Sequence, residues 1–241
     1  KYDIIYKTYY AGGMELKKIL LILLVISLSL SCLLIAAEQH IFDIKHYRRA
    51  YFAHDILQVT GKEYFQLESI TNDIFIYLRG KAGDEILEPN FNQREILHMR
   101  DVQVLFKYGF ILKYIAIILS IGLIIYFVLI GETKLVGKWI YKGLFVNLIF
   151  IGILGIMIYF DFTKYFTYFH YIFFTNDLWL LDPQTDLLIQ MLPEEFFSSI
   201  ATSIGLSFLG FVATIQGIGY AATKKGREKN EKGFKLFKRE S

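Results

Sequence analysis

Two histidines stand in segments whose residue types could carry acid–base chemistry. His170 lies in the run from Phe169 to Phe197, FHYIFFTNDLWLLDPQTDLLIQMLPEEFF, which also holds acids, prolines, a tryptophan and many aromatic residues. His98 lies three residues before Asp101, a spacing that places both side chains on one face of a helix. Because an imidazole can take up and release protons near neutral pH, these two segments are the candidates for a reaction site.

Each histidine also has a simpler structural explanation. His98 and Asp101 could form an ion pair on a helix surface, and the spacing alone favours that reading. His170 could be an incidental member of the aromatic belt that membrane proteins place at the membrane–water interface. The composition of its segment does not decide between a belt and a site.

Other kinds of reaction site leave patterns that this sequence lacks. It has neither the Gly-x-Ser-x-Gly motif of serine hydrolases nor the His-Glu-x-x-His motif of zinc enzymes. His40, His46 and His54 could meet around a metal ion, but the basic residues among them disfavour a cation. Cys32 lies within an apolar run and is expected to be a small buried hydrophobe. We therefore predict no metal ion and no cofactor.

The composition indicates a membrane protein. Of the 241 residues, 54% are hydrophobic, and the mean hydropathy of +0.40 is too high for an ordinary soluble domain. A formal net charge of +3 gives no support for nucleic-acid binding, and one cysteine excludes a disulfide framework. The sequence predicts an all-α integral membrane protein with four transmembrane helices, at residues 14–37, 108–130, 144–160 and 198–222.

The placement of lysine and arginine predicts the orientation of these helices, since basic residues concentrate on the cytoplasmic side. Lysines precede the first span and fill the loop 131–143, and the tail 223–241 is basic. Both termini are therefore predicted to be cytoplasmic, with the tail as a flexible stretch. The segments 38–107 and 161–197 are predicted to be extracellular, the first as a helical cap and the second as a loop that carries the motif around His170.

The start of the natural chain is expected at Met14, where Met-Glu-Leu-Lys-Lys precedes the first apolar run. Residues 1–13 are therefore expected to be a foreign extension. A cleaved lipoprotein signal ending before Cys32 is disfavoured, because Ser29 stands where a bulky aliphatic residue is required.

Local signals predict where the helices outside the membrane begin and end. An apolar stripe is predicted to form a helix that ends at Gly61, and a second one to end at Gly80. Asn92 and Glu95 have the spacing of a capping box, which predicts a helix that begins at Gln93 and continues into the second span. Asp182 followed by proline predicts a short helix over 183–191, and Pro193-Glu194 predicts the start of the helix of span four.

A family resemblance follows from these motifs taken together. Four spans, HMRDV at residues 98–102 and the long run that begins FHYIFFTND at Phe169 resemble Lit, the bacterial lipoprotein intramolecular transacylase family. The resemblance implies an enzyme of the bacterial cell membrane that acts on a membrane-anchored diacylglyceryl lipoprotein. It would move the acyl chain on the glyceryl sn-2 oxygen to the α-amine of the lipidated N-terminal cysteine. The two histidines of the family match His98 and His170.

The residues of both motifs can then be given expected roles. We expect His170 to act as the general base and His98 as the acid or the stabiliser of the oxyanion, although these two roles could be exchanged. Asp101 and Asp177 are candidates to orient a histidine, and Arg100 is a weaker candidate to stabilise charge. Four aromatic residues are expected to line the pocket, namely Phe169, Tyr171, Phe173 and Trp179.

Other functions stay open at this point. A non-catalytic accessory or sensor protein would hold His98 and His170 far apart and packed separately. A membrane esterase would release the same acyl chain to water. A transporter is disfavoured, because the spans lack ionisable groups in their central parts. The oligomeric state does not follow from the sequence.

Overall fold

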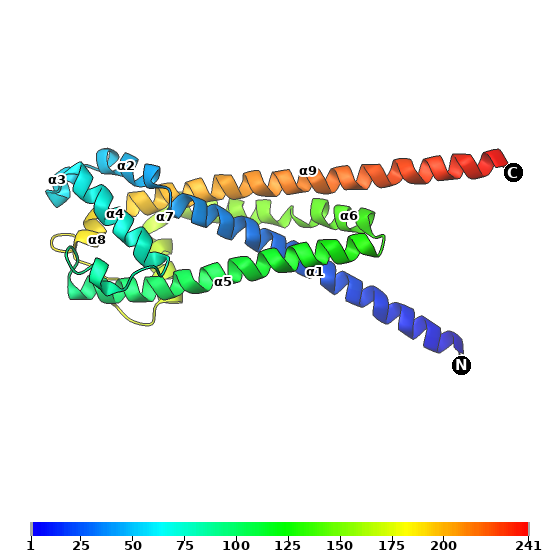
Figure 1. Cartoon of the computed structure of the whole chain (residues 1–241), viewed down its shortest axis with the longest axis horizontal. Helices are drawn as coiled ribbons and strands as arrows, with labels where there is room; N and C mark the ends of the chain where they lie inside the picture. Colours follow the sequence, from blue (N-terminus) through cyan, green and yellow to red (C-terminus); the bar gives the residue numbers. More distant parts are fainter. Residues whose placement is uncertain (1, 241) are drawn as a thin grey trace. The chain divides into compact units, whose positions relative to one another are not determined.

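The protein is entirely helical over the part of the chain that the structure describes. The computed structural model describes the backbone of residues 2–240 and the side chains of residues 14–224. No strand occurs among these residues, as the sequence predicted (Figure 1). The helices are α1 (Tyr2–Ile41), α2 (Ile44–Ala53), α3 (Ile56–Thr60), α4 (Tyr64–Leu78), the 3-10 helix η1 (Asp84–Ile86), α5 (Gln93–Leu129), α6 (Thr133–Gly143), α7 (Val146–Phe173), α8 (Leu187–Met191) and α9 (Glu194–Glu240).

Four helical segments of the described chain are long enough and apolar enough to cross a membrane, which confirms the predicted count of four. They are Met14–Ile41, Gln93–Leu129, Thr133–Phe173 and Glu194–Lys224. Many large apolar side chains on them are exposed, including Ile118 at 70% and Leu129 at 80%. Lipid would cover such side chains in a bilayer, whereas water would leave the protein prone to aggregate.

The ends of the predicted segments differ from the observed helices in two places. The backbone of α9 continues past the predicted end of span four to Glu240, and the flexibility expected of the tail stays a prediction. The outer segment that we described as a loop from residue 161 begins as helix and stays helical to Phe173. Asp161 has non-helical backbone angles, and its carboxylate accepts a hydrogen bond from the Lys164 amide at 3.1 Å. The helix is therefore kinked at Asp161 and capped again there rather than ended. The foreign extension expected at residues 1–13 has side chains outside the described range.

The chain divides into two compact units, which we describe separately. The first comprises Lys1–Leu33, Lys113–Ile151 and Ser207–Ser241. Within it, Ser120 donates a hydrogen bond to Ser27, and Asn147 donates one to Ser29. A Cβ atom added to Gly137 would lie 2.7 Å from the carbonyl oxygen of Gly219, so only glycine permits this approach of α6 and α9.

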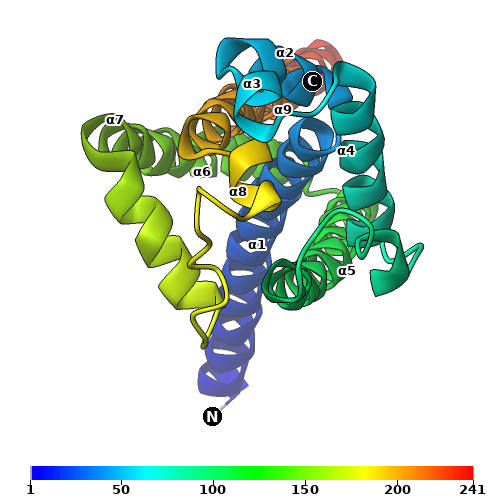
Figure 2. The ribbon, with the colours of Figure 1, turned by 90° about the vertical axis from the view of Figure 1, so that its left-hand side faces the viewer.

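The second unit comprises Leu34–Leu112 and Gly152–Leu206 and contains both histidine motifs. In this unit α2 packs against α3 and α4, and α3 packs against α8 (Figure 2). Tyr51 and Leu67 are completely buried between these helices. The Tyr51 hydroxyl lies 2.6 Å from the hydroxyl of Thr71, which satisfies two polar groups that are both inaccessible to water. The unit therefore has an apolar core of its own.

Two helix ends in this unit follow the glycine signals of the sequence. Gly61 and Gly80 have φ values of 63° and 67°, in the left-handed region that favours glycine. At Gly80 the amide donates to the Tyr77 carbonyl, and the next amide, of Lys81, donates to the Ile76 carbonyl. This pair of bonds is a Schellman motif, which ends α4. The helix predicted to end at Gly61 is in fact two helices, because Asp55 has a φ of 51° and separates α2 from α3.

The capping box predicted at Asn92 is present. The Asn92 side chain accepts hydrogen bonds from the amides of Arg94 and Glu95, and the Glu95 carboxylate accepts one from the Asn92 amide at 2.7 Å. Helix α5 begins at Gln93 and runs to Leu129 without interruption, as predicted. At a rise of 1.5 Å per residue, α5 is about 55 Å long. It is therefore longer than a bilayer needs, and His98 lies in its second turn, before the apolar run.

The short helix predicted at residues 183–191 is too long by one turn. The Asp182 carboxylate accepts a hydrogen bond from the Gln184 amide two residues later, which closes a turn instead of capping a helix. Helix α8 begins only at Leu187, after Asp186. The start of α9 at Glu194, directly after Pro193, agrees with the prediction.

Candidate active site

The two motif histidines lie against each other in the second unit. His98 projects from α5 and His170 from the last turn of α7, and their ring centroids are 6.2 Å apart. Both side chains are buried, with exposed fractions of 7% and 8%. The accessory-protein alternative required separated, independently packed rings, and this geometry contradicts that expectation.

The helix that carries His170 fixes which of its nitrogens bears hydrogen. Nδ1 of His170 lies 2.7 Å from the carbonyl oxygen of Phe166, one helical turn earlier. A carbonyl oxygen can only accept, so Nδ1 must donate. In the neutral ring Nε2 is then the nitrogen with a free lone pair. His170 is thereby prepared to accept a proton at Nε2.

Aromatic side chains enclose the His170 ring on several sides. Trp179 stacks on it with a centroid separation of 4.6 Å and an interplanar angle of 25°. Phe166 meets it edge-on at 4.5 Å, and Phe169 meets it edge-on at 5.6 Å. Such surroundings are dry and apolar, and they hold the ring in one orientation.

His98 differs from His170 because one of its nitrogens has no partner. Nδ1 of His98 is buried and makes no hydrogen bond within the described part of the chain. Phe174, which is also buried, packs edge-on against the His98 ring at 5.2 Å. Buried polar atoms are nearly always paired in folded proteins, so an unpaired imidazole nitrogen beside a second imidazole suggests a place for a reacting group.

The acids proposed to orient these rings are held elsewhere. Asp101 accepts a hydrogen bond from the Asn176 side chain at 2.8 Å, and no hydrogen bond or ion pair joins it to His98 among the described side chains. Asp177 is exposed, and its backbone carbonyl accepts a hydrogen bond from Arg94 at 2.5 Å. Neither acid holds a histidine directly, and the ion pair that we considered for His98 and Asp101 is not present either. The Asp101 carboxylate and the backbone carbonyl of Asp177 instead attach the segment after α7 to α5.

Arg100 is likewise engaged away from the two rings. Its guanidinium forms an ion pair with Asp84 and holds the pKa of that carboxyl below its ordinary value. The Arg100 side chain is 54% exposed. This pair connects α5 to η1 on the surface of the second unit.

We expect Arg100→Gln to leave the activity of the histidine site nearly unchanged. The ion pair is exposed to solvent, which screens it, and it holds Arg100 away from both rings, so the rate should change by no more than about threefold. The initial rate of product formation by the purified variant in detergent tests this. A fall of tenfold or more, at unchanged thermal unfolding, would instead place the Arg100 charge at the reacting groups.

The aromatic residues expected to line the site divide into two groups. Trp179 and Phe169 contact His170 directly. Tyr171 contacts Trp179, and Phe173 contacts Phe169, so these two support the ring contacts from outside. The sequence analysis missed Phe166, Phe174 and Asn176. Phe166 lies four residues before His170, a spacing that would have identified it if residues 161–173 had been interpreted as helix.

A polar hydrogen-bond network, buried at Glu95 and Asp186, joins the segments that carry the two histidines. Glu95 of α5 is 1% exposed, and its carboxylate accepts a hydrogen bond from the amide of Leu188 in α8 at 2.6 Å. Asn92 donates to Asp186 at 2.8 Å, and Asp186 also accepts from the amide of Asp182. The polar network thus connects the start of α5, which bears His98, to the segment that follows His170.

The described side chains include no group of three or more His, Cys, Asp or Glu residues that could hold a metal ion. His40 and His46 do lie together, with Nδ1 of the first 2.8 Å from Nε2 of the second, as in a hydrogen-bonded pair.

Comparison with known proteins decides the family. Residues 22–197 match the family described as lipoprotein intramolecular transacylase Lit. The chain belongs to this family. The matched segment contains both histidine motifs and the polar network that joins them. The Lit family is defined by acyl transfer within lipoproteins, so the chain is an acyltransferase of the membrane.

Solved structures of Lit have the same fold. The membrane-integral lipoprotein intramolecular transacylase Lit from Bacillus cereus superposes with a TM-score of 0.80 at 23% identity, over 89% of this chain and 99% of that one. A second structure of the Bacillus cereus protein, with one histidine replaced by arginine, gives a TM-score of 0.77 at 22% identity, over 93% and 98% of the two chains. No curated protein sequence matches the chain.

Proposed function

We propose that this Lit family member moves the sn-2 acyl chain of a diacylglyceryl-cysteine lipoprotein to the α-amino group of the same cysteine. His98 and His170 would carry the protons. The observation that most supports the proposal is the 6.2 Å separation of the two rings, since one compact glyceryl-cysteine headgroup can reach both. The product is a lyso-form lipoprotein with an N-acyl chain and one acyl chain left on the glyceryl group.

The proton inventory of this reaction requires both a base and an acid. The α-ammonium, with an ordinary pKa of about 8, must lose one proton before its lone pair can attack the ester carbonyl. A nitrogen–carbon bond then forms and the bond from carbonyl carbon to glyceryl oxygen breaks. The nitrogen loses a second proton and the departing oxygen gains one, so one proton is released in total. Nε2 of His170 is suited to take a proton from the amine, and His98 to give one to the oxygen or to donate a hydrogen bond to the oxyanion.

Positioning accounts for a large part of the expected catalysis. The tetrahedral intermediate contains a ring of eight atoms, and such rings close poorly in a flexible substrate. Holding amine and ester in contact can lower the barrier by roughly 7–11 kcal/mol. The aromatic rings around His170 suit this task, because they restrict the headgroup and exclude the water that would hydrolyse the ester.

We also propose that the histidine site faces the outside of the cell. The lysines of α6 and the basic residues after span four favour a cytoplasmic location for both termini. His98 lies before the apolar run of α5 and His170 at the end of α7, so both would lie at the outer membrane surface. A lipoprotein anchored in the outer leaflet presents its glyceryl-cysteine headgroup at this level.

Mass spectrometry of a diacylglyceryl lipoprotein, before and after incubation with the purified protein, tests the reaction. Transfer within one molecule conserves its mass, and fragmentation should find the acyl chain on the cysteine nitrogen. An esterase would instead lower the lipoprotein mass by one acyl chain and release free fatty acid. The double variant His98→Ala/His170→Ala provides the control, since spontaneous transfer would persist in it.

A further inference from the structure

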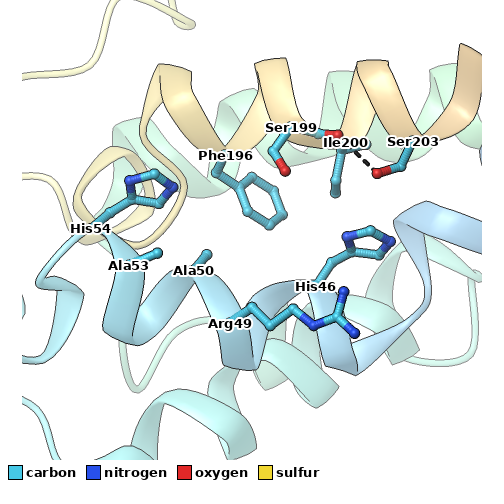
Figure 3. A pocket seen from close by; sticks show the side chains of 9 residues that line it. All are labelled: His46, Arg49, Ala50, Ala53, His54, Phe196, Ser199, Ile200 and Ser203. Atoms are coloured by element: carbon cyan, nitrogen blue, oxygen red, sulfur yellow. Dashed lines mark hydrogen bonds between the residues drawn. The ribbon is translucent and has the colours of Figure 1, made fainter.

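A cavity outside the histidine site lies in the same unit, between α2 and the first turns of α9. It has a volume of about 140 Å³ and shares no residue with the histidine site. Figure 3 shows Phe196, Ser199 and Ser203 pointing from α9 toward α2. From α2 and its C-terminal end, the polar groups that line the cavity are His46, Arg49 and His54.

The electrostatic character of this cavity is cationic. No carboxylate lines it. Arg48 is paired with Glu68 at 2.6 Å, whereas Arg49, its neighbour in sequence, forms no ion pair among the described side chains. A guanidinium that borders a cavity and is not paired with an acid favours an anionic ligand, which it can bind through two parallel hydrogen bonds.

The histidine beside Arg49 contributes hydrogen bonds rather than charge. Burial, together with nearby His40 and Arg49, holds the pKa of His46 below its ordinary value, although the carboxylate of Asp43 opposes this. Its Nε2 is already hydrogen-bonded to His40, which leaves Nδ1 for another partner. The permanent charge in the cavity is therefore that of Arg49, and the hydroxyl of Ser199 adds a further donor.

The apolar part of the lining favours a lipid over a free ion as the ligand. Phe196 and Ile200 are buried and form one wall, and Ala50 and Ala53 of α2 form another. Ser199 and Ser203 lie in the first three turns of α9, where the polar start of that helix gives way to the apolar run of span four. A phospholipid places its phosphate at this boundary and its glycerol and acyl groups next to it, whereas inorganic phosphate gains nothing from apolar walls.

We infer that this cavity binds the phosphate group of an anionic phospholipid, with Arg49 as the charged partner and Ser199, His46 and His54 as hydrogen-bond donors. Phe196 and Ile200 pack against the glycerol portion of the lipid. The lipid is bound as a ligand and not as the acyl donor, so this inference goes beyond the proposed acyl transfer and does not depend on it.

Native mass spectrometry of the detergent-solubilised full chain tests the site. The probes are dioleoylphosphatidylglycerol and the uncharged dioleoylglycerol, which has the same acyl chains without the phosphate. The wild-type chain should retain the phospholipid and not the diacylglycerol. Arg49→Gln should weaken phospholipid retention about tenfold, the effect of losing one charge-assisted hydrogen-bonded contact. Ser199→Leu, which fills the cavity without changing charge, should weaken it as well.

The matched control is Lys45→Gln, which removes one positive charge from the same helix at a residue that does not line the cavity. Retention should stay within about twofold in this variant, because exposed charges at a distance are screened. Equal losses in the Lys45 and Arg49 variants would show general attraction to a basic surface and overturn the site. Equal retention of diacylglycerol would do the same. Complete displacement of the lipid by inorganic phosphate would show that the cavity binds a free anion and would overturn the proposal of a phospholipid ligand. Arg49 is exposed, so circular dichroism should find its variant folded.

Discussion

Replacing His170 with alanine is expected to lower lyso-form production by about 10²–10⁴-fold, the usual contribution of one acid–base group. Its Nε2 is the nitrogen that the Phe166 carbonyl leaves free for a proton, and four aromatic rings fix its direction. The measurement is the initial rate of acyl transfer in a purified lipoprotein, followed by fragmentation mass spectrometry. Full activity in a folded variant would remove His170 from the mechanism.

Two further variants separate chemistry from folding at this position. His170→Asn places an amide near Nδ1, where it can still donate to the Phe166 carbonyl, but it has no group at the position of Nε2. We expect it to unfold at nearly the wild-type temperature and yet to be as inactive as His170→Ala. Tyr168→Ala is the matched control, because Tyr168 is an exposed aromatic residue of the same helix that packs on Tyr165 and not on His170.

Removing the His98 ring should lower activity as removing the His170 ring does, and the double variant should show whether the two rings act together. His98→Ala is expected to lose activity to a similar degree. If both imidazoles serve one proton path, the double variant should be little worse than either single variant, since removal of one already disables the unit. Losses that multiply in the double variant would mean that the rings make independent contributions.

The sequence predicted those features of the second unit that depend on a few neighbouring residues. The capping box at Asn92 and the glycine at the end of α4 are set by side-chain chemistry within four or five residues, and both were correct. The helix over 183–191 was wrong because Asp182 had two local options, and it closed a turn. Its choice depends on Asp186, which accepts hydrogen bonds from both the Asp182 amide and the distant Asn92.

The site itself depends on contacts that no spacing in the sequence reveals. His98 and His170 were paired only through the family resemblance, because they lie 72 positions apart in the chain. The same holds for Asp101, whose proximity in sequence to His98 suggested a direct bond, whereas Asn176 from the second motif holds it. Local spacing identified which residues could take part in chemistry. Their partners were decided by the long-range contacts of His170 and Asn176 with α5.

The second large effect is expected at Glu95, which contacts neither histidine ring in any described interaction. Glu95→Ala removes the acceptor of two backbone amides, those of Asn92 and Leu188. Leaving these groups without an acceptor should lower the free energy of unfolding by roughly 2–4 kcal/mol. Thermal unfolding in detergent, followed by circular dichroism, measures this effect. Glu88→Ala is the matched control, because Glu88 is exposed on the loop before α5 and its removal should change stability by less than about 0.5 kcal/mol.

Activity in the Glu95 variants distinguishes positioning from chemistry. The polar network joins the segments that bear the two rings. A displacement of about 1 Å between reacting groups can lower the rate about 10²-fold. Glu95→Gln keeps one carbonyl oxygen for the Leu188 amide, so it should recover part of both the stability and the rate. Stability and rate should therefore both fall in Glu95→Ala and both recover in part in Glu95→Gln. If glutamine restored the unfolding temperature but left the enzyme inactive, the negative charge of Glu95 would be acting in the reaction itself, and its assignment as a positioning residue would be wrong.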